Sequence, residues 1–566
     1  MQRRSHRDRT RTRTALCASI VLIASACGLA CSGNHQSSSD PSGGGAAKPP
    51  TTATCEAGEV PERRVAKLSD IHYRNAVFDL FGDVREAQSV RSPGVNASAF
   101  IPATAMVPVD GGLVLQYRTA AETLAAAFAR HAPGFLCSPD TVRADPCVQG
   151  WLSSFLSQAY RRPILPEELE DYSALFESGA SHGAEGGVRL VIQAALQAPS
   201  FLYTTELGTP PNSGTGDIAG PKNAGALPLT DHELASQLSF WLTDHAPDAE
   251  LRRAAEAGEL LREPAALSAQ AQRLLEAPDA QHTITEAIVR WFRLTELEHI
   301  HKDESVFPEF EPARQSLLSS VRLFIDGNVW QGARDFRDIF RAPNAYIDAA
   351  LAPIYAVPAP TEAGFVRQDF ATNERVGILT HPAFLARFAN QSEGQVVQRG
   401  LFVRRDLLCQ TLQAPPPGVN VAAITAGKSQ REAASFRANE PACAGCHSAI
   451  DPFGLMFSHY NAVGAYQPTL MGEPIDATAL ATNTDFDGPV NGAAELSEKL
   501  AQSELAQACI VQKMLAFSLS RTAPPASCEL APLQAHFSQS GYQLSELLLA
   551  IVNSKSFRFR RLEVAE

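Results

Sequence analysis

The sequence predicts an all-α fold, with several helical domains in series. Apolar residues recur at helical spacing along most of the chain, whereas the alternating pattern of strands is scarce. Stretches rich in proline and glycine separate the helical blocks. At 566 residues the chain is too long for one hydrophobic core, so about two to four domains are expected.

The first helix is expected in "LSDIHYRNAVFDLFG". Ser69 can cap its start, Tyr73, Val77 and Leu80 fall on one face, and Gly82 ends it. "GGVRLVIQAALQAPSFLY", "QHTITEAIVRWFRLTELEHI" and "PARQSLLSSVRLFIDGNVW" follow the same period. These segments extend the helical prediction into the middle of the chain.

A later helix is expected in "LTDHELASQLSFWLTDHAPD". Thr230 and Glu233 have the spacing of a capping box, and Leu234, Leu238 and Leu242 would share a face. Breaks are expected in the Pro/Gly-rich stretches 208–228 and 414–430. The predicted divisions are a signal peptide 1–26, a tether 27–54, N-terminal helical domains 55–215, a central helical domain 216–365, a helical segment with a Pro-rich linker 366–430, and a last part 431–566 that ends in a C-terminal helical domain.

The N-terminus has the pattern of an export signal. Six arginines and one aspartate precede a short apolar run, which ends in "ASAC". This ending resembles a bacterial lipobox, in which Cys27 would be lipidated; Cys31 is the alternative site, and cleavage to an unanchored exported protein is the other possibility. The stretch 32–54 is rich in Ser, Gly, Pro and Thr and suits a flexible tether. We therefore expect a periplasmic or outer-membrane lipoprotein, held to the membrane by its lipid.

The charge of the chain bears on its partners. The formal net charge is -13, and it becomes about -18 once residues 1–26 are removed. Such an acidic body argues against nucleic-acid binding and suits a partner with a positive face.

Cysteine usage also fits an exported protein. Cys137 and Cys147 enclose a short loop that a disulfide could close, and Cys509 and Cys528 flank one helical run. A Cys55–Cys409 pair is then left by subtraction, although connectivity cannot be proved from sequence.

The stretch "PACAGCHSAIDPFG" contains Cys443, Cys446 and His447 as C-x-x-C-H. This is the pattern for covalent attachment of one c-type haem, with the histidine as proximal iron ligand. Residues 431–566 are therefore expected to contain a cytochrome c-like haem domain. Zinc fits less well because few further Cys or His residues follow. For the distal iron ligand we favour Met471, whereas Met514 and Met456 suit core positions.

Other candidate sites are better explained as structure. Arg161 and Arg162 could bind a haem propionate or an acidic partner, but a helix end before a proline turn is the favoured interpretation. His299 and His301 could bind a metal, but a solvated helix end is favoured. The sequence identifies no catalytic residue.

The segments "RVGILTHPAFLARFANQSEGQVVQRGLFVRRDLLCQTLQAPPPGV" and "CAGCHSAIDPFGLMFSHYNAVGAYQ" resemble the planctomycete-type cytochrome c proteins. These are exported proteins of several domains of unknown function. The resemblance covers nearly the whole mature chain and implies haem attachment at Cys443 and Cys446, with His447 on the iron. Asp451, Pro452 and Gly454 match a family signature, which we interpret as a turn that shapes the haem crevice.

Three functions are compatible with these features. We favour single-electron transfer through one haem, with the helical body docking a periplasmic or cell-surface redox partner. The alternatives are a peroxidase- or oxygenase-like enzyme with an open distal site, and an anchored structural or sensory haem scaffold. A two-haem arrangement is excluded because the chain has one C-x-x-C-H.

Overall fold

The computed structural model describes residues 60–82, 100, 110–129, 145–209, 225–371, 373–412, 429–521 and 527–561. The predicted signal peptide and tether lie outside these residues, as do Cys27, Cys31, Cys55 and Cys137.

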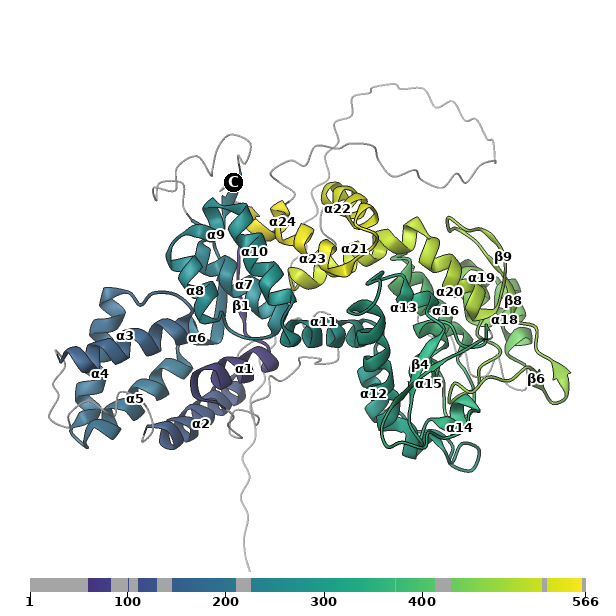
Figure 1. Ribbon diagram of the computed structural model, residues 1–566, viewed down its shortest axis with the longest axis horizontal. Coiled ribbons are helices and arrows are strands. Elements are labelled where there is room, and N and C mark those ends of the chain that lie inside the picture. Colours follow the sequence, from purple (N-terminus) through teal and green to yellow (C-terminus); the bar gives the residue numbers. More distant parts are fainter. Residues whose placement is uncertain are drawn as a thin grey trace, which may run out of the picture. The chain divides into compact units, whose positions relative to one another are not determined.

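The N-terminal part is a set of helices closed by a short sheet (Figure 1). The predicted cap of the first helix is confirmed, because Ser69 accepts a hydrogen bond from the His72 amide and Gly82 follows the last turn. The elements are β1 (Arg64–Lys67), α1 (Asp70–Phe81), α2 (Gly111–Phe128), α3 (Pro146–Tyr160), α4 (Pro166–Ala180), α5 (Ala184–Gln197), α6 (Pro199–Leu202) and β2 (Tyr203–Glu206).

The central part begins with the predicted capping box. Thr230 accepts from the Glu233 amide, and the Glu233 carboxylate accepts from the Thr230 amide. The elements are β3 (Ala226–Pro228), α7 (Asp231–Thr243), α8 (Ala249–Glu256), α9 (Glu259–Arg262), α10 (Pro264–Leu275), α11 (Pro278–Trp291), the 3-10 helix η7 (Leu294–His299), α12 (Phe310–Val329), α13 (Asp338–Arg341), β4 (Asn344–Ile347), α14 (Ala352–Tyr355) and β5 (Val366–Asp369).

The third part contains the C-x-x-C-H. Its elements are the 3-10 helix η8 (Ile378–Thr380), α15 (Pro382–Arg387), α16 (Val396–Phe402), the π-helix η9 (Val403–Leu407), α18 (Gln430–Asn439), α19 (Pro441–Leu455), β6 (Thr469–Leu470), β7 (Glu473–Pro474), β8 (Thr478–Ala481) and β9 (Gly488–Asn491). The C-terminal elements are α20 (Gly492–Gln502), α21 (Glu504–Ser518), α22 (Ser527–Gln539), α23 (Leu544–Val552), α24 (Lys555–Arg558) and β10 (Phe559–Arg561).

The described part of the chain is mostly helical, as predicted. Its strands are short and form antiparallel pairs: β1 with β2, β3 with β10, β4 with β5, β6 with β7, and β8 with β9. In the β3–β10 pair, Phe559 lies opposite Pro228, so the end of the described chain returns to the start of its central part.

Two large hydrophobic cores hold the helices together. One extends from Leu68 to Phe240 and joins α1 to α6 with the middle of α7. The other extends from Leu229 to Phe557 without interruption at positions 365 or 430. Phe453 of α19, the helix that carries the C-x-x-C-H, belongs to this second core, whereas Ala434 of α18 and Leu455 of α19 form a small separate cluster with Val396.

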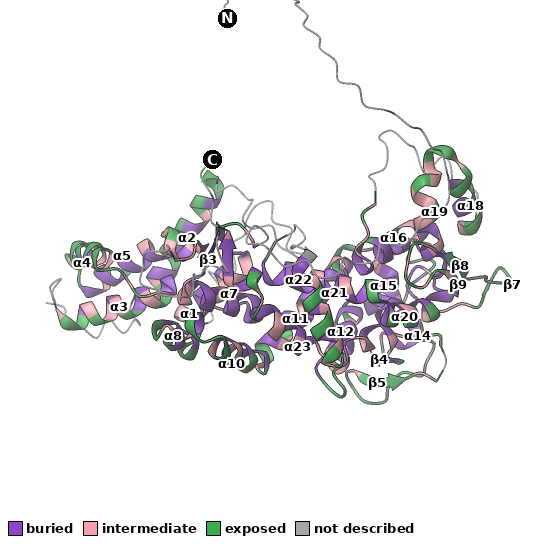
Figure 2. Ribbon diagram, turned by 90° about the horizontal axis from the view of Figure 1, so that it is seen from above, coloured by how far each residue is buried: buried purple, intermediate pink, exposed green. Residues whose placement is uncertain are grey.

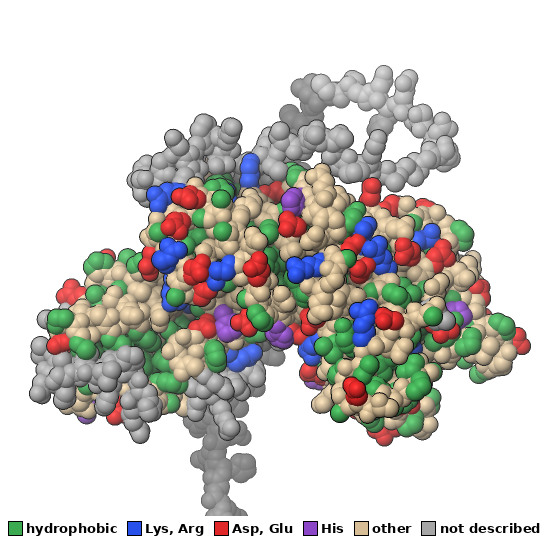
Figure 3. Space-filling model, viewed as in Figure 1, with side chains coloured by type: hydrophobic (Ala, Val, Ile, Leu, Met, Phe, Trp, Pro, Cys, Tyr) green, Lys and Arg blue, Asp and Glu red, His purple; other side chains and the backbone are tan. Residues whose placement is uncertain are grey.

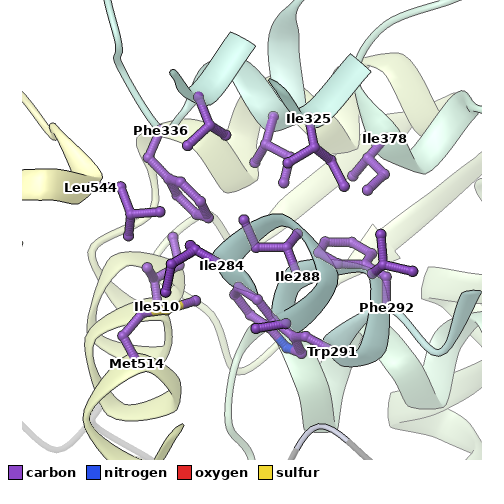
Figure 4. Packing of buried hydrophobic residues seen from close by; sticks show 14 of the residues in the cluster. Ile284, Ile288, Trp291, Phe292, Ile325, Phe336, Ile378, Ile510, Met514 and Leu544 are labelled. Atoms are coloured by element: carbon purple, nitrogen blue, oxygen red, sulfur yellow. The ribbon is translucent and has the colours of Figure 1, made fainter. Parts of the chain in front are cut away.

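Helix α11 lies in the middle of the second core (Figure 4). Ile284 and Ile288 of α11, and Phe292 directly after it, face Ile325 of α12 and Ile378 of η8 on one side. Helices α21 and α23 cover the other side. Burial of this many large apolar side chains is the main favourable term in folding. This core also includes Phe402 of α16 and Phe453 of α19, so it fixes the position of both helices.

Acidic and basic side chains are interspersed on the face of the molecule that Figure 3 shows. Within the described ranges, no helix combines the length and the apolar character needed to cross a membrane.

Candidate functional site

The C-x-x-C-H lies on the first two turns of α19. Pro441 occupies the first helical position, where its missing N–H costs nothing, and the amide of Cys443 donates to the Glu440 carbonyl. Cys443 and Cys446 are free, half-buried thiols one turn apart. Because residues three and four apart share a helix face, His447 lies on the same side as Cys443.

The second half of α19 is docked tightly on α16. A Cβ added at Gly400 would lie 2.0 Å from the Ile450 carbonyl oxygen, and one added at Gly454 would lie 1.9 Å from the Val396 carbonyl oxygen. Only glycine allows the two backbones to approach this closely. The last turns of the helix are therefore fixed, while its first turns remain at the surface (Figure 2).

Arg399 fixes the end of α19. This side chain is 2% exposed and donates to carbonyls at the end of α15 and just beyond α19. Burial lowers the pKa of Arg399 to about 9, which leaves the guanidinium charged at neutral pH. The acceptors are Leu385, Phe388, Phe457, Tyr460 and Asn461. Two neighbouring residues thus have different structural roles: Arg399 binds the carbonyls beyond the end of α19, and Gly400 allows α16 to pack closely on α19.

Asp451 links His447 to a buried arginine. Its Oδ1 lies 2.9 Å from His447 Nδ1, and its Oδ2 accepts from Arg437 Nε of α18 at 2.8 Å. The side chains of Asp451 and Arg437 are 2% and 7% exposed, whereas that of His447 is 19% exposed. The imidazole is therefore held through its Nδ1, and among the described residues none forms a hydrogen bond with its Nε2.

The interpretation of Asp451, Pro452 and Gly454 as a turn was wrong, since all three lie inside α19. A proline within a helix leaves the carbonyl four residues earlier without its partner. That carbonyl belongs to Ser448, which is exposed to water, so the helix continues. The i, i+4 spacing of His447 and Asp451 was the sequence signal that could have revealed their contact.

Arg404 supports the middle of α19. Its Nε donates to the Ala449 carbonyl at 3.0 Å, and its guanidinium lies 4.4 Å from the centre of the Phe453 ring. Burial lowers the pKa of Arg404 to about 10, so it stays charged near pH 7. The structure thus holds α19 from α16, from η9 and from α18.

The methionines lie in different environments. Met471 is on the turn between β6 and β7 and is 98% exposed. Met456 and Met514 are fully buried in the core, where the sequence suggested they would pack. His459 stacks on Tyr466 and bonds the Gln467 carbonyl. A distal role for Met471 stays a prediction.

The disulfide expected between Cys509 and Cys528 was wrong, as was the Cys55–Cys409 pair. Cys509 is bonded to Cys409 across 100 residues, which ties α21 to the end of η9. Cys147 and Cys528 each take part in a disulfide as well. The predicted partner of Cys147, Cys137, lies outside the described residues.

The arginine pair has the structural role that the sequence favoured. Arg161 ends α3 in a left-handed conformation, and its buried guanidinium donates to the carbonyls of Ala159, Ser200, Phe201 and Tyr203. Arg162 forms two hydrogen bonds with Glu168.

The histidines near position 300 belong to a helix end and the loop beyond it. His299 ends η7, and His301 is exposed and pairs with Glu311. Among the described residues, no group of three or more His, Cys, Asp or Glu side chains could hold a metal ion.

A cavity of about 390 Å³ lies elsewhere in the molecule. Its walls include Lys67, His72, Phe240, Trp241 and Phe517, from β1, α1, α7 and α21. None of its lining residues belongs to α18 or α19, so this cavity is separate from the C-x-x-C-H.

Exposed apolar side chains lie on the elements that contact the helix of the C-x-x-C-H. Helix α18 and strand β8 both contact α19, and they expose Phe436 and Leu480, which are 38% and 56% accessible. Two free thiols, an imidazole with its Nε2 unbonded by any described residue, and nearby apolar side chains are the groups that a covalently bound haem requires. The residues present fit this group.

Four protein-family models match the chain in series. Each is described as a protein of unknown function: residues 147–206 match DUF1595, 229–357 match DUF1592, 375–470 match DUF1588, and 487–557 match DUF1585. The DUF1588 model bears the name PSCyt3, and its match contains Cys443, Cys446 and His447. Comparison with curated proteins and with solved structures finds no match.

Proposed function

The chain belongs to the planctomycete-type cytochrome c multidomain family, and from this premise we propose that it is an exported, lipid-anchored c-type cytochrome. One covalent haem c would be carried on α19, and the helical body would dock a redox partner. The observation that carries the proposal is the pair of free thiols, one turn apart and followed by His447, within the residues matched by the cytochrome-type model.

The roles of the residues follow from their chemistry. The S–H groups of Cys443 and Cys446 would add across the two vinyl groups of the haem to give thioether bonds, and His447 Nε2 would bind the iron. When bound, the haem supplies one-electron exchange between ferric and ferrous iron. Helix α19 must keep the three side chains in register, which the close contact of Gly454 with α16 and the cap from Arg399 accomplish.

The test is expression of the full chain in a bacterium that has the c-haem maturation machinery. We expect sharp α and β bands on reduction, and haem that remains with the protein after extraction with acidified acetone. Replacing Cys443 and Cys446 by serine should abolish the attachment. Ser448→Ala is a matched control, because Ser448 is exposed on the same helix and its hydroxyl bonds only the Ala444 carbonyl among the described residues.

The spectrum distinguishes the proposed function from a haem enzyme. A six-coordinate, low-spin spectrum agrees with electron transfer, whereas a high-spin spectrum that shifts with carbon monoxide or peroxide would replace this proposal with an open-site enzyme. A wild-type protein without covalent haem would refute both. The lipid anchor is tested separately: Cys27→Ser should release the protein from the membrane, and Cys31→Ser should not.

A further inference from the structure

The buried carboxylate of Asp451 determines which nitrogen of His447 carries a proton. A carboxylate can only accept hydrogen bonds, and Oδ2 of Asp451 already accepts one from Arg437. The 2.9 Å contact to Oδ1 then requires a proton on Nδ1 of the imidazole. The neutral ring is left with a bare Nε2, which is the form that binds a metal ion.

The same contact increases the electron density on the imidazole. A carboxylate that accepts from one nitrogen of a histidine raises the basicity of the other nitrogen, as in metal sites that contain a carboxylate–histidine pair. A more basic ligand stabilises the more positively charged state of a bound iron. The ferric form would therefore gain more than the ferrous form, and the reduction potential would fall.

Arg437 opposes this effect. It donates to the second oxygen of Asp451 at 2.8 Å and so withdraws part of the carboxylate charge from His447. Arg437 comes from α18, which begins at Ser429 with a capping box to Glu432. The strength of the Asp451–His447 bond thus depends on how α18 lies against α19.

We propose that Asp451 is a positioning residue, which holds His447 as the Nδ1–H tautomer and lowers the reduction potential of an iron bound at Nε2, while Arg437 limits the lowering. This inference rests on the proposed attachment of haem at His447. It predicts shifts of opposite sign when the two residues of one ion pair are neutralised.

The experiment measures the reduction potentials of four full-length holoproteins by spectroelectrochemistry: wild type, Asp451→Asn, Arg437→Gln and the control Glu440→Gln. Loss of a residue that forms a hydrogen bond with a metal ligand changes metal affinity by about tenfold or more. For Asp451→Asn we expect the stability of ferric relative to ferrous iron to fall about tenfold, a rise in potential of about 59 mV for one electron. Arg437→Gln should lower the potential.

Glu440→Gln removes the same charge as Asp451→Asn. Glu440 precedes α19 by one residue, and its side chain forms no capping hydrogen bond. If Glu440→Gln raises the reduction potential as much as Asp451→Asn does, the rise is a simple effect of the lost charge and the inference is overturned.

The buried Arg437 would lose its carboxylate partner in Asp451→Asn, and an unpaired buried charge destabilises the fold. The double variant Asp451→Asn/Arg437→Gln avoids this unpaired charge. Its potential should exceed that of Arg437→Gln alone, and equal potentials would contradict the proposal.

A second readout does not use the haem. In the apoprotein, the ¹⁵N chemical shifts of the His447 ring should show the proton on Nδ1 at mildly alkaline pH, and Asp451→Ala should move it to Nε2. A wild-type ring with the proton on Nε2 would refute the inference while haem attachment stands. Absence of covalent haem in the wild type would refute the proposed function and this inference together.

Discussion

The contact between α16 and α19 leads to a prediction that needs no cofactor. Replacing Gly454 by alanine puts a methyl group 1.9 Å from the Val396 carbonyl oxygen, where ordinary contact begins at 3.4 Å. The two helices would have to separate locally by about 1.5 Å. The obstacle is backbone and not a flexible side chain, so repacking of rotamers cannot relieve it.

The magnitude follows from two opposing terms. Alanine is more favourable than glycine inside a helix by about 1 kcal/mol. Overpacking in a dense interior destabilises by about 1–3 kcal/mol, and a clash with backbone belongs at the upper end. For Gly454→Ala we therefore expect a net loss of about 2 kcal/mol.

Gly445 provides the matched control on the same helix. A Cβ at Gly445 meets no atom within 4 Å, so Gly445→Ala should retain only the helical gain of about 1 kcal/mol. The measurement is urea unfolding of the oxidised apoprotein, followed by circular dichroism. We expect the two variants to differ by about 3 kcal/mol, and equal midpoints would refute the close-packing argument.

Three further predictions concern separate features. Replacing both Cys409 and Cys509 by serine removes a cross-link over 100 residues and should lower the free energy of unfolding by up to about 4.7 kcal/mol; an unchanged urea midpoint would contradict this. Burial lowers the pKa of His381 to about 3, so between this value and about 6.5 the unfolded chain binds a proton that the folded chain does not, and stability falls as the pH decreases. His381→Asn keeps a side chain that can accept from the Ala383 amide; the pH profile of its unfolding should lack about 1.4 kcal/mol per pH unit of this loss, and parallel profiles would refute the assignment. If Met471 is the distal ligand, Met471→Ala should lower the reduction potential and convert the haem to high spin, while the stability of the apoprotein stays unchanged because the side chain is 98% exposed there; an unaltered spectrum would rule out this ligand.

The helical class and the helix starts could be read from the sequence because they depend on neighbouring residues. Ser69 caps α1, and Thr230 with Glu233 caps α7, as their spacing indicated. A cap needs only a side chain that reaches an amide two or three residues away. The C-x-x-C-H was also recognisable, because its chemistry lies within five consecutive positions.

The sequence did not reveal which distant residues meet. Cysteine spacing favoured Cys509 with Cys528, but packing of α21 beside the end of η9 brings Cys509 to Cys409. Loop closure becomes only slowly more unfavourable with length, so short separation is a weak guide to pairing.

For the candidate site, the amino-acid sequence by itself determined the reactive groups, which are two thiols and an imidazole. It also determined the order of the domains around them. Only the tertiary structure decided that Asp451 lies beneath His447 within a continuous helix, and that Arg437 from a second helix neutralises it. The physical reason is that a buried charge is stable only beside a partner. Which partner is available depends on how α18 packs against α19, and no local pattern specifies that contact.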